Sequence, residues 1–189
     1  MNSDLKKLIL EKDQMAPQVA VTMGSDSDLQ ALYPGLAILK KLMIPFETRI
    51  LSAHRTPLTM MDFAQQAESN GFKVIIAGAG GSAHLPGMIA SLTTLPVIGV
   101  PIKSKSLGGV DSMHSIIQMP GGVPVATVAI DGGLNAGLLA AQILAISDKR
   151  IEKEIKKYRA NLHNEVRGKD KKLLDIGIDA YMESMINKQ

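Results

Sequence analysis

Three short loops of this sequence carry side chains that could bind an anion or transfer a proton. The first is GSDSD at Gly24 to Asp28, the second is SAHRTP at Ser52 to Pro57, and the third is the glycine-rich GAGGSAH at Gly78 to His84. Arginine and polar groups at helix starts bind phosphate, and histidine changes charge near neutral pH. These residue types would suit acid–base chemistry on a phosphorylated small molecule.

His54 and Arg55 stand side by side in the second loop. His54 could act as a general acid or base, and Arg55 could bind a phosphate through two parallel hydrogen bonds. Each also has a plainer interpretation, because a lone histidine is often a surface residue and an exposed arginine often forms only a surface ion pair. His84, in the glycine-rich loop, could line the same pocket or cap a helix. His114 and His163 lie in helical patterns, and no role is assigned to them.

The first loop combines Ser25, Ser27 and Asp28. These residues could bind phosphate and sugar hydroxyls, because a helix N-terminus presents unpaired N–H groups to anions. Serine and aspartate are also favoured helix N-caps, so capping alone explains them equally well. The loop therefore allows two interpretations, substrate binding and helix capping.

The sequence lacks the patterns of several common metal and cofactor sites. It contains no cysteine, no HExxH motif and no paired-carboxylate pattern. The loop GAGGSAH departs from GxGxxG, and no acidic residue stands at the end of the next strand, where a dinucleotide site would need one. We therefore expect neither a metal ion nor a bound cofactor.

The first and third loops each follow a short apolar run that is typical of a buried strand in a parallel sheet. The second loop follows Pro45 to Leu51, which alternates enough between apolar and polar residues to be a strand as well. Helical patterns separate five predicted strands, at residues 18–23, 45–51, 74–77, 97–100 and 125–130. Five strands alternating with helices predict a three-layer α/β sandwich. Ligands bind at the carboxyl ends of such strands, so the three loops are expected to meet at one edge of the sheet.

The connecting segments carry apolar residues at spacings of three and four, as helices do. Pro34 should either kink the first helix or mark its start. Thr56 followed by Pro57 should cap the second helix, which should end near Gly71. Further helices are predicted at residues 83–93, 110–118 and 134–147.

Two more apolar stripes follow the predicted sandwich. They are Ile151, Ile155, Tyr158 and Leu162, and then Leu174, Ile178, Tyr181 and Met185. Because the sandwich is already complete, these stripes should cover a neighbouring subunit. The chain is accordingly divided into an N-terminal arm at residues 1–17, a catalytic α/β domain at 18–147 and C-terminal helices at 148–189.

The composition is that of a globular protein, with 46% hydrophobic and 21% charged residues among 189. Aromatic residues amount to only 3%, which leaves no stacking platform for single-stranded nucleic acid, so no nucleic-acid partner is expected. No apolar run approaches the ~18 residues that a membrane span needs. The absence of cysteine suits a reducing compartment, and a cytoplasmic location is expected.

Four segments together resemble the 5-(carboxyamino)imidazole ribonucleotide mutases of purine biosynthesis. They are the two loops GSDSD and SAHRTP, followed by AGAGGSAHLPG at Ala77 to Gly87 and QMPGGVPVA at Gln118 to Ala126. The four occur in the family's order and at matching intervals. The AHLPG and GVP segments are similar to the mutase class, rather than to the related class that carboxylates aminoimidazole ribonucleotide with free carbon dioxide.

The resemblance implies a flavodoxin-like fold, a homo-octamer whose terminal helices embrace neighbours, and a reaction without metal or cofactor. A carboxylate would move from the exocyclic nitrogen of the ribonucleotide to ring carbon C4, with His54 as the catalytic acid and base. The backbone from Gly78 to Ala83 would hold carbon dioxide in a small dry pocket. The substrate-binding residues implied are Ser25, Ser27, Asp28, Ser52, Ala53, Arg55, Gly80, Gly81, Ser82 and His84.

Two other functions stay open at this point. One is direct carboxylation of aminoimidazole ribonucleotide on the same fold. The other is a non-catalytic nucleotide- or flavin-binding module, because a fold alone does not determine function. His54 beside Arg55, and the lack of aromatic residues to sandwich a flavin, argue against this second alternative.

Overall fold

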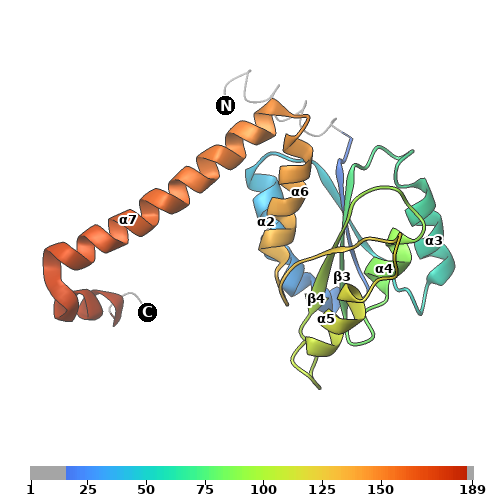
Figure 1. Ribbon diagram of the computed structural model, residues 1–189, viewed down its shortest axis with the longest axis horizontal. Coiled ribbons are helices and arrows are strands. Elements are labelled where there is room, and N and C mark those ends of the chain that lie inside the picture. Colours follow the sequence, from blue (N-terminus) through green and yellow to red (C-terminus); the bar gives the residue numbers. More distant parts are fainter. Residues whose placement is uncertain (1–15, 187–189) are drawn as a thin grey trace, which may run out of the picture.

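Five parallel strands form one sheet in the order β2-β1-β3-β4-β5 (Figure 1). This strand order is that of the flavodoxin-like fold, as the sequence predicted. The computed structural model describes residues 16–186, so the predicted arm at 1–17 lies almost wholly outside the described residues. The elements are β1 Val19–Met23, η1 Asp26–Asp28, α2 Leu29–Lys41, β2 Phe46–Ile50, α3 Pro57–Gln66, β3 Val74–Gly80, α4 Leu85–Ala90, β4 Val97–Ile102, α5 Val110–Ile117, β5 Ala126–Thr127, α6 Gly133–Ala145 and α7 Lys149–Ile186.

Helices cover both faces of the sheet, which makes the three-layer sandwich. In β1, Val19 and Val21 join a buried cluster with α2, α6 and the start of α7, whereas Ala20 joins the cluster under α3 and α4. Figure 1 shows α2 and α6 on one side of the strands and α3, α4 and α5 on the other. Because both of their faces are buried, β1, β3 and β4 are almost entirely apolar, whereas the edge strand β2, with the sequence FETRI, is polar and partly exposed.

The helix α2 begins at Leu29, so Pro34 lies inside it and does not mark its start. Ser25 begins the preceding turn, η1, with a capping box: its Oγ accepts the Ser27 N–H, and the Asp28 carboxylate accepts the Ser25 N–H. This cap starts the helical path upstream of the proline. The same helix packs closely on α6, where a Cβ added at Gly133 would collide with the carbonyl oxygen of Ala31.

Several predicted boundaries differ from the structure. The helix predicted at residues 83–93 is reduced to Leu85–Ala90, and the strand predicted at 125–130 is reduced to Ala126–Thr127, an edge strand that pairs only with β4. Thr56 does not cap α3 with its side chain, because its Oγ1 instead bonds the N–H and the carbonyl of Ser52. Gly71 does end the turns that follow α3, with a φ of 92°.

The two predicted C-terminal helices form one long element, α7, whose only non-helical break among the described residues lies at Gly177. Ile151 and Ile155 are buried in the chain's own core, so the expectation that they cover a neighbour is wrong. The remainder projects away from the sandwich, and every residue from 159 to 180 is exposed (Figure 1). No helix among residues 16–186 is long and apolar enough to cross a membrane.

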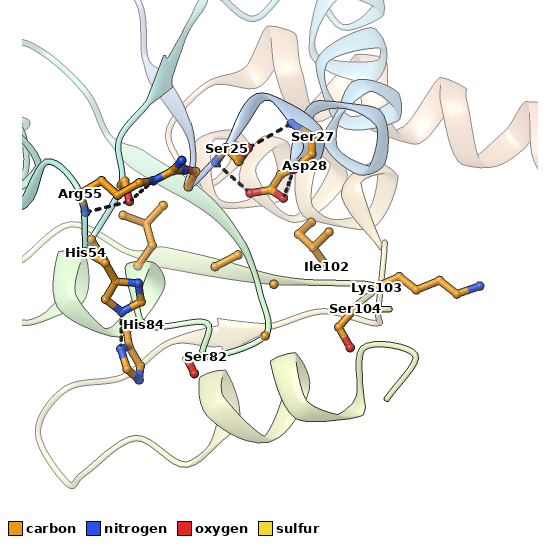
Figure 2. A pocket seen from close by; sticks show the side chains of 17 residues that line it. Ser25, Ser27, Asp28, His54, Arg55, Ser82, His84, Ile102, Lys103 and Ser104 are labelled. Carbon is orange, nitrogen blue, oxygen red and sulfur yellow. Dashed lines mark hydrogen bonds between the residues drawn. The ribbon is translucent and has the colours of Figure 1, made fainter. Parts of the chain in front are cut away.

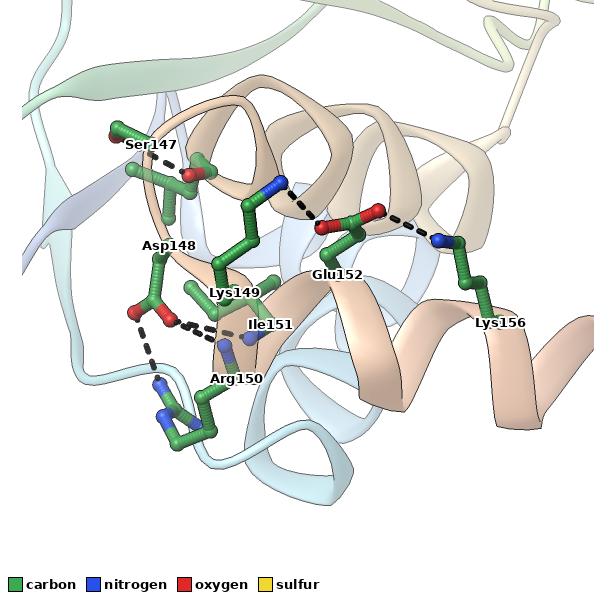
Figure 3. Close-up of polar contacts among 8 residues, drawn as sticks. Ser147, Asp148, Lys149, Arg150, Ile151, Glu152 and Lys156 are labelled. Atoms are coloured by element: carbon green, nitrogen blue, oxygen red, sulfur yellow. Dashed lines mark hydrogen bonds and ion pairs between the residues drawn. The ribbon is translucent and has the colours of Figure 1, made fainter.

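Polar contacts fix the start of α7 on the sandwich (Figure 3). The Asp148 carboxylate accepts the backbone N–H groups of Arg150 and Ile151 at 2.8 and 3.2 Å, as a helix cap does. The Arg150 guanidinium donates to the carbonyl of Leu42, just after α2, at 3.0 Å. Hydrogen bonds from Lys156 and Lys149 lower the pKa of Glu152 to about 2. The Arg150 hydrogen bond and the buried Ile151 and Ile155 therefore attach the start of α7 to the sandwich.

Candidate active site

The three loops singled out in the sequence meet at the carboxyl edge of the sheet, around a cavity of about 500 Å³ (Figure 2). They follow β1, β2 and β3, which are adjacent in the sheet, so their ends come together. The predicted catalytic and substrate-binding residues all line this cavity: Ser25, Ser27, Asp28, Ser52, Ala53, His54, Arg55, Gly80, Gly81, Ser82 and His84. Of the segment from Gly78 to Ala83 that was expected to hold carbon dioxide, Ala79 to Ser82 line the cavity, whereas Gly78 and Ala83 do not.

Five lining residues were not among those predicted from the sequence: Gly24, Leu85, Ile102, Lys103 and Ser104. The last three follow or end β4, which is the fourth neighbour in the sheet. The rule that places ligands at strand ends applied to β4 as well, and its polar Lys103-Ser104 end was the available signal. A second cavity of about 690 Å³ lies beside the first and shares Ser27, Ile102, Lys103 and Ser104 with it.

Asp28 is the buried acid of the site, with 8% of its surface exposed. Its two carboxylate oxygens accept hydrogen bonds from the Ser25 N–H at 3.1 Å and from the Ser27 Oγ at 3.3 Å. Burial raises the pKa of Asp28, an effect that these hydrogen bonds and the charge of Arg55 oppose only in part. Capping and cavity lining therefore coexist at this residue.

Arg55 connects the first two loops. Its Nε donates to Ser52 Oγ at 3.3 Å, and its Nη2 donates to the carbonyl of Gly24 at 2.8 Å (Figure 2). These bonds hold the guanidinium next to Ser25, at the rim of the cavity. A positive charge fixed beside the start of a helical turn is a suitable arrangement for an anion such as phosphate.

His54 and His84 lie in contact although they come from different loops. The Nε2 atom of His54 is 2.8 Å from the Nδ1 atom of His84, and the rings meet edge to face at 78° (Figure 2). One of these nitrogens must carry the hydrogen and the other must accept it, so the tautomers of the two rings are linked. Both side chains are exposed to the cavity, and the pair can pass a proton from one ring to the other.

The cavity therefore combines a rim that carries the positive charge of Arg55, a buried carboxylate and a pair of imidazoles in contact. Within residues 16–186, no group of three or more histidine and acidic side chains could hold a metal ion. The chemistry that these side chains themselves supply is proton transfer beside a bound anion.

Comparison with known protein families gives a match to the AIR carboxylase model over residues 18–165. An N5-carboxyaminoimidazole ribonucleotide mutase of Synechocystis is 51% identical over 89% of this chain and 96% of its own length. The corresponding mutase of Saccharolobus solfataricus is 58% identical over 79% of this chain and 95% of its own length.

A second kind of relative is much longer. The phosphoribosylaminoimidazole carboxylase of Candida albicans is 51% identical over 95% of this chain, and this chain spans only 32% of that protein. Among solved structures, a Treponema denticola PurE has a TM-score of 0.76 and 32% identity over 83% of this chain and 98% of its own. The family model covers both the sandwich and the residues around the cavity, and the chain therefore belongs to the AIR carboxylase family.

Proposed function

We propose that this protein is a mutase that converts 5-(carboxyamino)imidazole ribonucleotide to 5-amino-4-carboxyimidazole ribonucleotide in purine biosynthesis. The observation that carries the proposal is the position of His54, a proton-transfer group in a cavity whose rim holds Arg55 and whose wall is the glycine-rich end of β3. Relatives named as mutases match this chain over nearly their whole length, which supports the same conclusion.

The two ends of the cavity suit the two ends of such a substrate. Arg55, with Ser25 and Ser52 beside it, would bind the phosphate, and Asp28 would accept a hydrogen bond from a ribose hydroxyl. This places the imidazole toward His54 and the glycine-rich loop. The loop from Gly80 to His84, called here the glycine loop, supplies backbone and small side chains, so a planar ring and a linear gas molecule can approach closely.

The reaction can be written with His54 as the single proton carrier. Protonated His54 gives its proton to the exocyclic nitrogen while the bond from that nitrogen to the carboxylate breaks, which leaves an amine and carbon dioxide. The electron-rich ring carbon C4 then attacks carbon dioxide and forms a new carbon–carbon bond. Neutral His54 removes the hydrogen from C4, so the ring regains its aromaticity and the histidine regains its proton. The substrate and product are isomers, and no external group is consumed.

Direct carboxylation of aminoimidazole ribonucleotide is the second candidate. It is favoured by the name of the Candida albicans relative, whose identity to this chain equals that of the Synechocystis mutase. Identity therefore does not separate the two reactions. They share the C4 chemistry and differ in whether carbon dioxide comes from the substrate's own nitrogen or from solution.

The choice of one-carbon source tests the proposal. Purified protein is given either the N-carboxylated or the uncarboxylated ribonucleotide, each with and without added bicarbonate, and formation of the C4-carboxylated product is followed. A mutase should convert the N-carboxylated substrate at low bicarbonate, because enclosed carbon dioxide has a high effective concentration. Efficient turnover of only the uncarboxylated substrate, at a rate that rises with bicarbonate, would assign the protein to the carboxylases instead.

We further propose that the active form is a homo-octamer in the cytoplasm. The exposed part of α7 supports association between copies, because it carries apolar side chains such as Val166, Leu174 and Ile178, which are 65–77% exposed. The number eight rests on the resemblance to the mutases, and the location rests on the absence of cysteine. Light scattering of the purified protein measures the assembly mass directly.

A further inference from the structure

Ser112, in the first turn of α5, contacts the wall of the cavity from behind. Its side chain is fully buried, at 0% exposure, and it is not among the residues that line the cavity. Its Oγ donates to the carbonyl of Ile102 at 2.6 Å and accepts the N–H of Gly81 at 2.8 Å. A single hydroxyl thereby joins the end of β4 to the glycine loop, using its donor and an acceptor at once.

Neighbouring residues of α5 hold the same two segments. Ser115 Oγ lies 3.3 Å from the carbonyl of Gly81. Asp111 accepts a hydrogen bond of 2.7 Å from Ser104, whose Oγ also accepts N–H groups from the loop that follows β4. Residues 111–115 of α5 therefore contact both cavity-lining segments. In Figure 2, α5 lies on the opposite side of the glycine loop from Ser25 and Asp28.

The bond from Ser112 also determines which way one peptide group faces. No peptide bond among the described residues is cis, so the carbonyl of Gly80 points opposite to the N–H of Gly81. With that N–H directed at Ser112, the Gly80 carbonyl is directed away from α5. Turning this peptide over would change only ψ of Gly80 and φ of Gly81, and glycine tolerates such changes at little cost. Gly81 already has a φ of +66°.

We infer that Ser112 is a positioning residue, whose hydroxyl fixes the Gly80–Gly81 peptide and so keeps the carbon dioxide pocket closed between the two halves of the reaction. This inference rests on the proposed mutase function. Two adjacent glycines give the loop the close approach that the substrate needs, but they do not select a single backbone orientation. The buried Ser112 hydroxyl, which donates to the Ile102 carbonyl, selects the orientation in which the Gly81 N–H points toward α5.

Loss of the hydroxyl has a specific chemical consequence. When the pocket wall turns over, carbon dioxide formed in the first step escapes before C4 attacks it. The nitrogen has already received its proton, so the released products are the uncarboxylated amine and carbon dioxide. We expect the fraction of turnovers that end in this amine to rise, and kcat for the C4-carboxylated product to fall by about 10²-fold, as for a small displacement of a reacting group.

The experiment compares Ser112→Ala with a matched control, Thr22→Val. Thr22 is also fully buried and donates its hydroxyl to a strand carbonyl, that of Ile76, at 3.2 Å, but it does not contact the glycine loop. Three measurements are made on the full-length protein: product and amine formation from the N-carboxylated substrate, corrected for decay without enzyme; thermal unfolding; and deuterium exchange of a peptide spanning Gly81. Ser112→Cys, which keeps a weak donor and acceptor, serves as the second variant.

Ser112→Ala should raise amine release and speed exchange at Gly81, Ser112→Cys should give smaller changes, and Thr22→Val should leave both at the wild-type level. If Ser112→Ala and Thr22→Val release the same fraction of turnovers as the uncarboxylated amine, the positioning role is wrong, whatever the change in thermal stability. If the wild-type protein fails to convert the N-carboxylated substrate, the mutase proposal fails. In that case faster exchange in the variant would still uphold the backbone positioning, and unchanged exchange would remove it.

Discussion

The imidazoles of His54 and His84 lie 2.8 Å apart, Nε2 to Nδ1, although 30 positions separate them in the chain. The two residues follow neighbouring parts of the sheet, His54 after β2 and His84 after β3, with β1 between these strands. The contact links their tautomers, so a proton gained at one ring changes which nitrogen can donate at the other. The first two predictions test this pair.

His54→Asn should lower kcat by roughly 10²–10⁴, the usual contribution of general acid–base catalysis, while substrate affinity is largely kept. Asparagine retains polar atoms of similar reach but cannot cycle a proton. Steady-state kinetics together with direct substrate binding measure the two effects separately. A variant with normal kcat and weak binding would assign His54 to recognition.

His84→Ala should reduce kcat by roughly 10- to 10²-fold, corresponding to a lost hydrogen bond to a charged group of ~1.5–3 kcal/mol. If His84 acts only through His54, the double variant with His54→Asn should be no slower than His54→Asn alone. Additive losses in the double variant would show that the two histidines act independently.

Arg55→Ala should mainly raise KM, because the guanidinium at the rim is expected to bind the phosphate; the loss should be ~1.5–3 kcal/mol of binding free energy. Arg49→Ala is the control, since Arg49 is exposed, pairs with Glu47 at 3.1 Å and does not line the cavity. A substrate-bound structure in which Arg55 turns to solvent would contradict this assignment.

Asp28→Asn should increase stability at neutral pH relative to the wild type, at the expense of substrate binding. The folded pKa of Asp28 is raised by burial, so the folded protein binds this proton more tightly than the unfolded chain. Its stabilising contribution is complete below the ordinary pKa of 3.8 and is lost as the pH rises through the raised folded pKa. The free energy of unfolding, measured by urea denaturation, should rise in the variant relative to the wild type as the pH increases from 3.8 through the raised folded pKa. A difference between the two proteins that does not change with pH would contradict the prediction.

Truncation after Ala160 should yield a smaller assembly by light scattering. This cut keeps Ile151 and Ile155 in the core and removes the exposed apolar part of α7. A second truncation after Ile176, before the break at Gly177, separates the contribution of the terminal segment. An unchanged mass for both truncated proteins would mean that α7 makes no subunit contact.

The sequence by itself determined the sandwich and the place of the site. Short runs rich in apolar and β-branched residues, such as Val19–Met23, are typical of strands buried on both faces, and parallel strands bring their carboxyl ends to one edge. The loops with His54, Arg55 and the glycines therefore had to meet. Local spacing was sufficient for this, because strand type and loop position depend on near neighbours in the chain.

Tertiary structure decided what depends on distant partners. Pro34 lies inside a helix because the capping box at Ser25 starts the helical path before it. Ile151 and Ile155 are covered by the chain's own core, although their spacing matches that of the exposed stripe further along α7. The His54–His84 contact and the bond from Ser112 to Gly81 join residues about 30 positions apart. The spacing of apolar residues indicates which face of a helix or strand is apolar. Only the tertiary structure determines which other residues pack against that face.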